Sequence, residues 1–179
     1  SSREDALQRV KEADVLIINK IKVDKELIDA APNLKLICVA ATGVNNVDLE
    51  YAASKGIPVR NAVGYSTESV VQSTFMTMLA LVGKLRHFDY YVKSGKYSLG
   101  DIFTDMSNMF FELNGKQLGV IGMGNIGTRV AQVATAFGMR VVYFSTSGTS
   151  HEKAYPSVSL EALMKESDVI SIHAPYNER

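Results

Sequence analysis

Three glycines between residues 122 and 127 have the spacing that most clearly indicates a ligand-binding site in this sequence. Gly122, Gly124 and Gly127 follow the pattern G-x-G-x-x-G. The first glycine permits a tight turn from strand to helix, the second lets the backbone approach a pyrophosphate, and the third lets the helix lie close to the sheet. Phosphates bind well at a helix N-terminus, where unpaired N–H groups and the helix dipole favour anions. The pattern therefore predicts a dinucleotide site.

The residues around the glycines have the pattern of a strand-helix-strand unit, which makes the glycine spacing more specific. Residues 116–121 predict an apolar strand, and residues 125–137 predict a helix that ends at Gly138. A second apolar strand follows at Arg140–Phe144. A unit of about 30 residues suits a right-handed crossover between parallel strands.

Helix and strand patterns alternate along almost the whole chain. This alternation predicts an α/β fold with two doubly wound parallel sheets. The expected helices cover residues 3–11, a stretch after Asp24, and residues 48–55, 66–94, 125–137 and 160–166; the expected strands cover residues 15–19, 34–41, 58–61, 116–121, 140–144 and 168–175. Residues 96–114 are expected to be an irregular passage between two domains.

The composition excludes several classes of function. The 179 residues carry 19 basic and 19 acidic side chains without a basic cluster, so a nucleic-acid partner is not expected. Cys38 has no partner for a disulfide, and no Cys/His spacing predicts a metal site, which suits the cytoplasm. No apolar run is long enough for a membrane span. The chain lacks an initiator Met and stops just after a strand, which indicates a piece of a longer protein.

Ligands of open α/β sheets bind beyond the carboxyl ends of the strands, so the loops that follow the strands of the first half are candidate ligand sites. A turn at Gly43 with free backbone amides could hold a carboxylate, and Lys20 could add a positive charge. The alternative is that Asn45, Asn46 and Asp48 only form a turn and cap a helix.

Position 145 bears on the choice of cofactor. An Asp or Glu at the end of this strand usually accepts hydrogen bonds from the adenosine ribose of NAD, whereas the residue here is Ser145. Without a carboxylate, a 2′-phosphate would not be repelled, but Arg, the preferred phosphate ligand, is absent from the loop. NAD and NADP both stay open, with NADP slightly favoured. Polar residues that could surround a 2′-phosphate are Thr146, Ser147, Ser150, His151 and Lys153.

The three histidines do not form a catalytic group. His87 is expected at the surface of the long helix, and His151 lies in the loop after Ser145. His173 ends a strand near the expected adenosine ribose, away from the path of a hydride. No triad or paired carboxylate stands out.

Motifs spread over the whole chain resemble the D-isomer-specific 2-hydroxyacid dehydrogenase family. They occur in the family's order: the segment 34–49 with its Ala-Thr-Gly-Val-Asn-Asn-Val-Asp, then 55–59, 67–72, the glycine pattern, and Asp-Val-Ile-Ser-Ile-His-Ala-Pro at 168–175. Within the family, Ala-Thr-Gly-x-x-Asn-Val-Asp followed by Gly-Tyr-Ser-Thr looks most like the glycerate dehydrogenase, or hydroxypyruvate reductase, branch.

This resemblance implies a flavodoxin-like substrate domain at residues 1–97, lacking its first strand, and the first half of a Rossmann NAD(P)-binding domain at residues 98–179. It implies hydride transfer between a nicotinamide and a small 2-oxo acid, and a homodimer. The amides of Thr42 and Gly43 would bind the substrate carboxylate. The implied cofactor contacts are Val70 at the nicotinamide, Asn125 and Ile126 at the pyrophosphate, Ser145 at the ribose, and Ala174 and Pro175 at the adenosine.

The sequence departs from the family in its catalytic motifs. The family's catalytic Arg, Glu and His lie in later motifs that this sequence does not contain, so no catalytic residue is assigned and the 179 residues alone are expected to be inactive. Two alternatives remain: a dinucleotide-sensing regulator like the corepressors of the family, and a short-chain reductase. The second is disfavoured because no Tyr-x-x-x-Lys pair follows the glycines.

Overall fold

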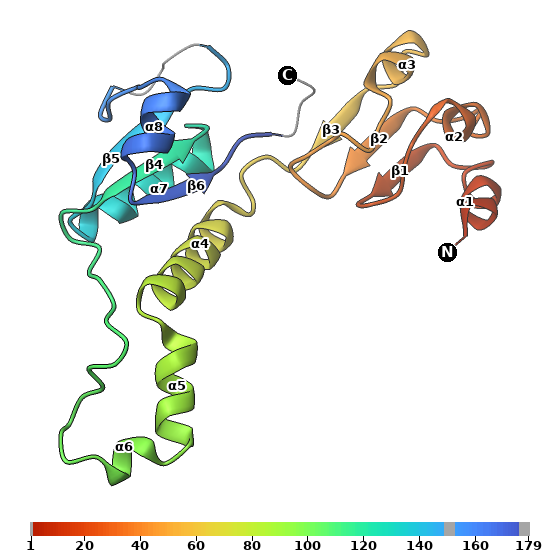
Figure 1. Ribbon diagram of the computed structural model, residues 1–179. Helices are drawn as coiled ribbons and strands as arrows, with labels where there is room; N and C mark the ends of the chain where they lie inside the picture. The colour runs from red at the N-terminus through yellow and green to blue at the C-terminus, as the bar shows by residue number, and fades with distance from the viewer. Residues whose placement is uncertain (1, 149–152, 176–179) are drawn as a thin grey trace. The chain divides into compact units, whose positions relative to one another are not determined.

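The computed structural model describes residues 2–148 and 153–175, and the chain forms two compact units, Ser1–Ser66 and Thr67–Arg179 (Figure 1). Each unit contains a three-stranded parallel sheet whose strands alternate with helices. The predicted α/β class with parallel sheets is thereby confirmed. No helix of the described residues is long and apolar enough to cross a membrane. Those residues also contain no cluster of three or more potential metal ligands.

The first unit is a sheet with helices between its strands. Its elements are α1 (Arg3–Arg9), β1 (Val15–Ile18), α2 (Lys25–Asp29), β2 (Leu36–Val39), α3 (Leu49–Ser54) and β3 (Val59–Asn61). The strand order is β1-β2-β3. Cys38 lies within β2 and is half-buried. The core beneath the sheet includes Val23, Leu27, Ile37 and Ala52, which are almost fully buried.

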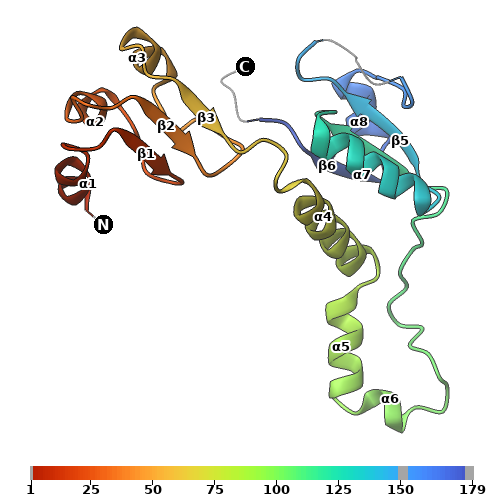
Figure 2. The same ribbon diagram turned by 180° about the vertical axis from the view of Figure 1, so that it is seen from behind.

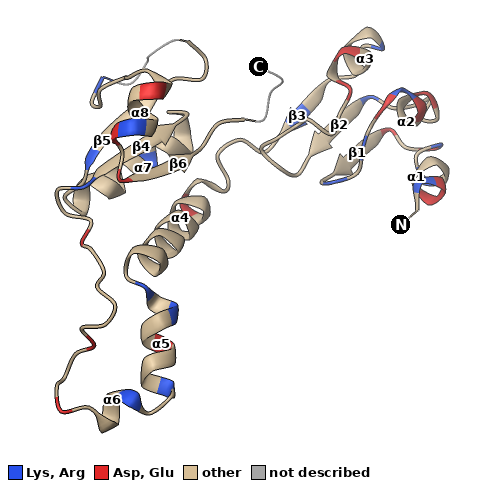
Figure 3. Ribbon diagram, viewed as in Figure 1, with Lys and Arg blue, Asp and Glu red and all other residues tan. Residues whose placement is uncertain are grey.

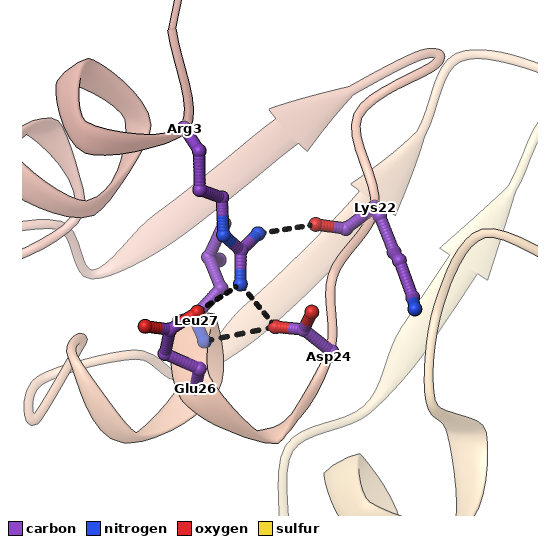
Figure 4. A network of polar contacts seen from close by, with 5 residues as sticks. All are labelled: Arg3, Lys22, Asp24, Glu26 and Leu27. Atoms are coloured by element: carbon purple, nitrogen blue, oxygen red, sulfur yellow. Dashed lines mark hydrogen bonds and ion pairs between the residues drawn. The ribbon is translucent and has the colours of Figure 1, made fainter.

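Asp24 fixes the start of α2 and links it to α1. Its carboxylate accepts a hydrogen bond of 3.2 Å from the N–H of Leu27, as an N-cap residue should. The guanidinium of Arg3 contacts this carboxylate and that of Glu26, and donates to the carbonyl of Lys22 at 3.0 Å (Figure 4). Partial burial opposes ionisation, but the hydrogen bonds from Arg3 and Leu27 hold the pKa of Asp24 below its usual range.

The second unit has helices on both faces of its sheet. Its elements are α4 (Thr67–Val82), α5 (Leu85–Lys93), α6 (Lys96–Leu99), β4 (Gln117–Ile121), α7 (Asn125–Ala136), β5 (Arg140–Phe144), α8 (Leu160–Glu166) and β6 (Val169–Ile172). The strand order is β5-β4-β6. Helix α8 lies in front of this sheet in Figure 1, whereas α7 lies in front in the opposite view of Figure 2.

The single helix predicted over residues 66–94 is wrong. Helix α4 ends at Val82, and α5 begins at Leu85. Between them Lys84 has a left-handed conformation with φ +49°, which breaks the helix. Gly83 precedes this residue and is the stop signal that the apolar periodicity concealed. Short helix α6 likewise lies in the passage that was expected to be irregular.

Contacts within this chain group α4 with the second unit, which begins at Thr67, N-terminal to the domain boundary predicted at 97/98. The reason is that α4 packs on α7, with Val71, Phe75 and Met78 in the same core as Val130 and Ala134. Phe75 also stacks on Phe137, with ring centroids 5.4 Å apart. Apolar burial therefore joins α4 to the second sheet. Where the domains of the whole protein divide stays a prediction.

Residues 100–112, which return from α6 towards β4, are held along α5 by specific contacts. Oδ2 of Asp105 lies 2.7 Å from Nε2 of His87, and the N–H of Ser107 donates to Oδ1 of Asp105 at 2.9 Å. The rings of Phe88 and Phe110 meet edge to face. Hydrogen bonds from Ser107 and His87 lower the pKa of Asp105 to about 2. His87 is therefore half-buried and hydrogen-bonded, not a free surface residue.

The low pKa of Asp105 predicts a pH effect on stability. Its folded-state pKa of about 2 is below its ordinary value of 3.8, so the carboxylate stabilises the fold above about pH 4, and this contribution is lost as the pH falls towards 2. Thermal unfolding of the wild type and Asp105→Asn should therefore differ most above about pH 4, with the wild type more stable. A difference that stays constant down to about pH 2 would contradict this assignment.

Gly119 in β4 allows α8 to pack closely on the sheet. A Cβ at this position would lie 2.5 Å from Oγ of Ser167 and 2.7 Å from Cδ2 of the fully buried Leu163. We expect Gly119→Ala to lower the free energy of unfolding by about 1–3 kcal/mol, because the core is overpacked. The double variant Gly119→Ala/Ser167→Ala should recover part of this loss in chemical denaturation, since it removes the nearest atom. No recovery would mean that Leu163 alone sets the limit.

Candidate functional site

The carboxyl ends of β4, β5 and β6 meet at one edge of the second sheet. The N–H of Gly122, just after β4, donates to the carbonyl of Phe144 at the end of β5, at 3.0 Å. The N–H of His173, just after β6, donates to the carbonyl of Ile121 at 2.7 Å. Helix α7 begins three residues after Gly122. In an open parallel sheet, this is the edge at which ligands bind.

The three glycines of the pattern have different physical roles at this edge. Gly122 has φ +91°, and a Cβ there would lie 2.7 Å from the carbonyl oxygen of His173. A Cβ at Gly127 would lie 2.1 Å from the carbonyl oxygen of Gly122, so only glycine lets α7 approach the turn. A Cβ at Gly124, by contrast, would meet nothing within 4 Å. Gly122 and Gly127 thus serve packing, whereas Gly124 leaves exposed backbone facing open space.

The N-terminus of α7 has the properties of an anion site. Gly124 is its N-cap residue, and no side chain of the described residues caps the helix. The first N–H groups of an α-helix have no partner within the helix, and its dipole favours negative charge there. Asn125 is exposed in this turn, and Ile126 is half-buried against the core. The predicted pyrophosphate residues therefore lie together at an uncapped helix start.

Ser145 follows the last residue of β5 and is half-buried at the same edge. Its Oγ lies 3.2 Å from Oγ of Ser147. Thr146 lies between them and Lys153 is exposed, whereas Ser150 and His151, which were predicted to help bind a 2′-phosphate, lie outside the described residues. The structure therefore brings hydroxyl groups to the predicted ribose position.

The residues after β6 form the third part of the carboxyl edge of the second sheet. The ring Nε2 of His173 lies 2.8 Å from Oγ of Ser171, and partial burial lowers the pKa of His173 below its usual value. Ala174 follows, with its backbone N within 2.9 Å of where a Cβ of Gly122 would be. Pro175 is exposed at the last described position. The two predicted adenosine residues are thus adjacent to the glycine turn, beside a histidine that tends to stay neutral.

A cavity of about 730 Å³ lies within the second unit, between α4 and β6. Val70, the predicted nicotinamide contact, lines it together with Ser73 and Thr77 of α4 and Ser171 of β6. Ser73 and Thr77 were not identified from the sequence. Their spacing of three and four residues is a helical face that could have indicated them.

An ion pair connects the starts of the two helices that flank this region. Nε of Arg129 in α7 lies 3.0 Å from Oε1 of Glu68 in the first turn of α4. Both side chains are largely exposed, so the pair contributes little to stability. Its effect is to orient the first turn of α4 relative to α7.

The first unit has its own group of loops at the carboxyl edge of its sheet. Nδ2 of Asn46 donates to the carbonyls of Asn19, at 3.1 Å, and Ile21, at 2.8 Å, which joins the loop after β2 to the loop after β1. Nδ2 of Asn61 donates to the carbonyl of Thr42 at 2.6 Å, which joins it to β3. Asn61 was not identified from the sequence, because a lone Asn at a strand end has no distinctive signal.

Lys20, Thr42 and Gly43, the predicted carboxylate ligands, are all exposed on these joined loops. Asp48 caps α3 through the N–H of Tyr51, at 3.0 Å. Asn46 bridges loops, as described above. The predicted capping role of Asp48 is therefore confirmed, whereas Asn46 joins two loops, and ligand binding by Lys20, Thr42 and Gly43 stays a prediction.

Comparisons with known proteins agree with this geometry. Residues 75–179 match the family model described as "D-isomer specific 2-hydroxyacid dehydrogenase, NAD binding domain". The glyoxylate reductase of Thermococcus litoralis is 36% identical over 174 residues, which cover 94% of this chain and 53% of the reductase. The hydroxypyruvate reductase of Thermotoga maritima is 36% identical over 177 residues, covering 98% of this chain and 56% of the reductase.

A solved structure is similar over the same range. The D-lactate dehydrogenase from Aquifex aeolicus, complexed with NAD and lactic acid, is 38% identical, with a TM-score of 0.83. The match covers 96% of this chain and 51% of that enzyme, so this chain spans about half the length of the relatives it matches. The family model matches more than half of this chain, from the middle of α4 through the glycine turn to its end. The chain therefore belongs to the D-isomer specific 2-hydroxyacid dehydrogenase family.

Proposed function

We propose that the whole protein is an NAD(P)-dependent oxidoreductase that transfers hydride reversibly between a nicotinamide and a small 2-oxo or 2-hydroxy acid, such as hydroxypyruvate and D-glycerate. The observation that carries this proposal is the uncapped start of α7, reached by the open backbone of Gly124 at the edge where three parallel strands end. Glyoxylate and hydroxypyruvate reductases among the relatives support the substrate class.

The residues of this edge fit a dinucleotide. The exposed backbone of Gly124 and the first turn of α7 at Asn125 and Ile126 would hold the pyrophosphate, because no side chain stands between backbone and open space at Gly124. Gly122 and Gly127 would contribute by letting this turn lie close to the sheet. Ser145 would contact the adenosine ribose, and Ala174 and Pro175 would line the adenosine pocket. Val70 would contact the nicotinamide side. When bound, the nicotinamide supplies or accepts the hydride.

The loops of the first unit would hold the acid. The exposed turn at Thr42 and Gly43 would bind its carboxylate through backbone amides, with Lys20 adding positive charge nearby. Asn46 and Asn61 would act as positioning residues, since their amides hold these loops together. The groups that polarise the 2-oxo group and move the proton would come from motifs outside this sequence, so residues 1–179 alone are expected to show no turnover.

The finer proposals concern the cofactor and the assembly. Ser145 brings no negative charge to the proposed ribose position, so the protein accepts both NAD and NADP, with a slight preference for NADP. The whole protein acts as a homodimer in the cytoplasm, to which a free, half-buried thiol at Cys38 is suited.

Substitution of two of the glycines separates cofactor binding from packing. Gly124→Ala should change the free energy of unfolding by less than about 1 kcal/mol, because nothing lies within 4 Å of the new methyl group. It should raise the dissociation constant of NADH or NADPH at least about tenfold, since that methyl group meets the pyrophosphate. Gly127→Ala should instead destabilise the fold by about 1–3 kcal/mol or more. Titration calorimetry and chemical denaturation measure both. Unchanged cofactor affinity in Gly124→Ala would contradict the proposed site.

Turnover tests the reaction, and Ser145→Asp tests the cofactor choice. The whole protein should oxidise NADPH or NADH in the presence of hydroxypyruvate, as measured by absorbance of the reduced nicotinamide.

Ser145→Asp should lower kcat/KM with NADPH by about tenfold or more, because a carboxylate repels the 2′-phosphate, and should leave NADH at least as effective. Ser145→Asn is the uncharged control. Dinucleotide binding without turnover of any 2-oxo acid would favour a regulator.

A further inference from the structure

The loop after β2, residues 42–48, carries four polar side chains, and three of them serve the structure. The hydroxyl of Thr42 donates to a backbone carbonyl just after β3 at 3.2 Å, Asn46 joins this loop to the loop after β1, and Asp48 caps α3. Asn45 is the exception, because it is exposed and its side chain forms no hydrogen bond with any residue that the structure describes. A polar side chain without a structural role at a proposed ligand site is a candidate for contact with the ligand.

The backbone that carries Asn45 is fixed. The N–H of Val47 donates to the carbonyl of Val44 at 2.9 Å, which closes a tight turn around Asn45 and Asn46. The N–H of the fully buried Val23 donates to the carbonyl of Asn46 at 2.8 Å, so this turn is attached to the core. A side chain on such a turn starts from a defined position before a ligand binds, as selective recognition requires.

The side chain of Asn45 lies against the turn that is proposed to bind the substrate carboxylate. A Cβ at Gly43 would lie 3.2 Å from Oδ1 of Asn45, so the amide group folds back over this turn. In a 2-oxo acid, only C2 separates the carboxylate carbon from C3. An acid whose carboxylate is bound by the amides of Thr42 and Gly43 therefore brings its C3 substituent within reach of a side chain that borders the same turn.

The charge at this edge suits an acid with one carboxylate and a neutral group on C3. Residues 40–47 after β2 and 62–67 after β3 carry no charged side chain (Figure 3). Lys20, in the loop after β1, is exposed and forms no ion pair with a described residue. Nδ2 of Asn46 donates to the carbonyls of the residues on both sides of Lys20, which holds Lys20 beside the turn. Its ammonium can neutralise the carboxylate, whereas the amide of Asn45, which is both a donor and an acceptor, matches an uncharged hydroxyl.

We propose that Asn45 determines specificity at C3 of the substrate: its amide hydrogen-bonds a 3-hydroxyl group, as in hydroxypyruvate, and gains nothing from a methyl group, as in pyruvate. This inference rests on the proposed function and deepens it, because it assigns the choice among small 2-oxo acids to one side chain. A site that hydrogen-bonds a substrate hydroxyl discriminates against the analogue that lacks it, because the polar group of the site is then left unpaired. At an exposed position, where water competes, one uncharged hydrogen bond discriminates by about tenfold.

The test is the steady-state reduction of three acids by the whole protein: hydroxypyruvate with a hydroxyl on C3, pyruvate with a methyl group, and glyoxylate, which has no C3. Asn45→Leu keeps nearly the shape of the side chain and removes its donor and its acceptor. Asn33→Leu is the matched control, because Asn33 is also exposed but precedes β2, at the opposite end of this strand from Asn45. Thermal unfolding of each variant checks that the fold is intact.

The wild type should have a higher kcat/KM with hydroxypyruvate than with pyruvate, by about tenfold or more. Asn45→Leu should lower the value for hydroxypyruvate about tenfold and change the values for pyruvate and glyoxylate less than about twofold, because only the 3-hydroxyl loses a partner. Asn33→Leu should leave all three values unchanged.

An equal fall with all three acids in Asn45→Leu, or no fall with hydroxypyruvate, would overturn the inference and leave the proposed function standing. A wild type that prefers a 2-oxo diacid such as oxaloacetate would also overturn it, since a basic residue such as Lys20 would then bind the second carboxylate. Failure of the wild type to reduce any of these acids would refute the proposed function together with the role of Asn45.

Discussion

The close approach of α7 to the end of β4 is the constraint on which the candidate cofactor site depends. A single methyl group at Gly127 would come within 2.1 Å of the carbonyl oxygen of Gly122. Since no side chain separates the two, the first turn of α7 begins against the sheet edge. This places the positive end of the helix dipole beside the ends of β5 and β6. A β-carbon at Gly127 would move the helix away from this edge, whereas one at Gly122 would collide with the backbone of His173 after β6.

The rest of the second unit supports this approach by apolar packing. Val71, Phe75 and Met78 of α4 cover one side of α7, and Leu118 and Val120 of β4 cover another. Exposed ion pairs such as Arg129 with Glu68 orient elements but contribute little to stability. In the first unit, amide side chains have a comparable orienting role, since Asn46 and Asn61 join the loops of the proposed substrate turn. Packing therefore fixes both sheets, and a few hydrogen bonds fix the loops that would contact ligands.

The sequence predicted what depends on local chemistry. The apolar strands, the cap at Asp48 and the turn at the three glycines have residue types and spacings that are typical of one local structure. Features that depend on long-range packing were not predictable in this way. The break at Lys84 lies inside a continuous apolar periodicity, and the grouping of α4 with the second sheet follows from its contacts with α7. The loop-joining role of Asn61 required knowledge of which strands are neighbours.

Amide NMR of the isotope-labelled protein during titration with NADPH or NADH tests the central claim most directly. Backbone N–H groups at the start of α7 should hydrogen-bond the pyrophosphate, so the amides of Gly124, Asn125 and Ile126 should show the largest changes in chemical shift. Smaller changes should follow at Ser145 and Ala174. Saturable binding that leaves those three α7 amides unchanged, while residues elsewhere respond, would contradict the account.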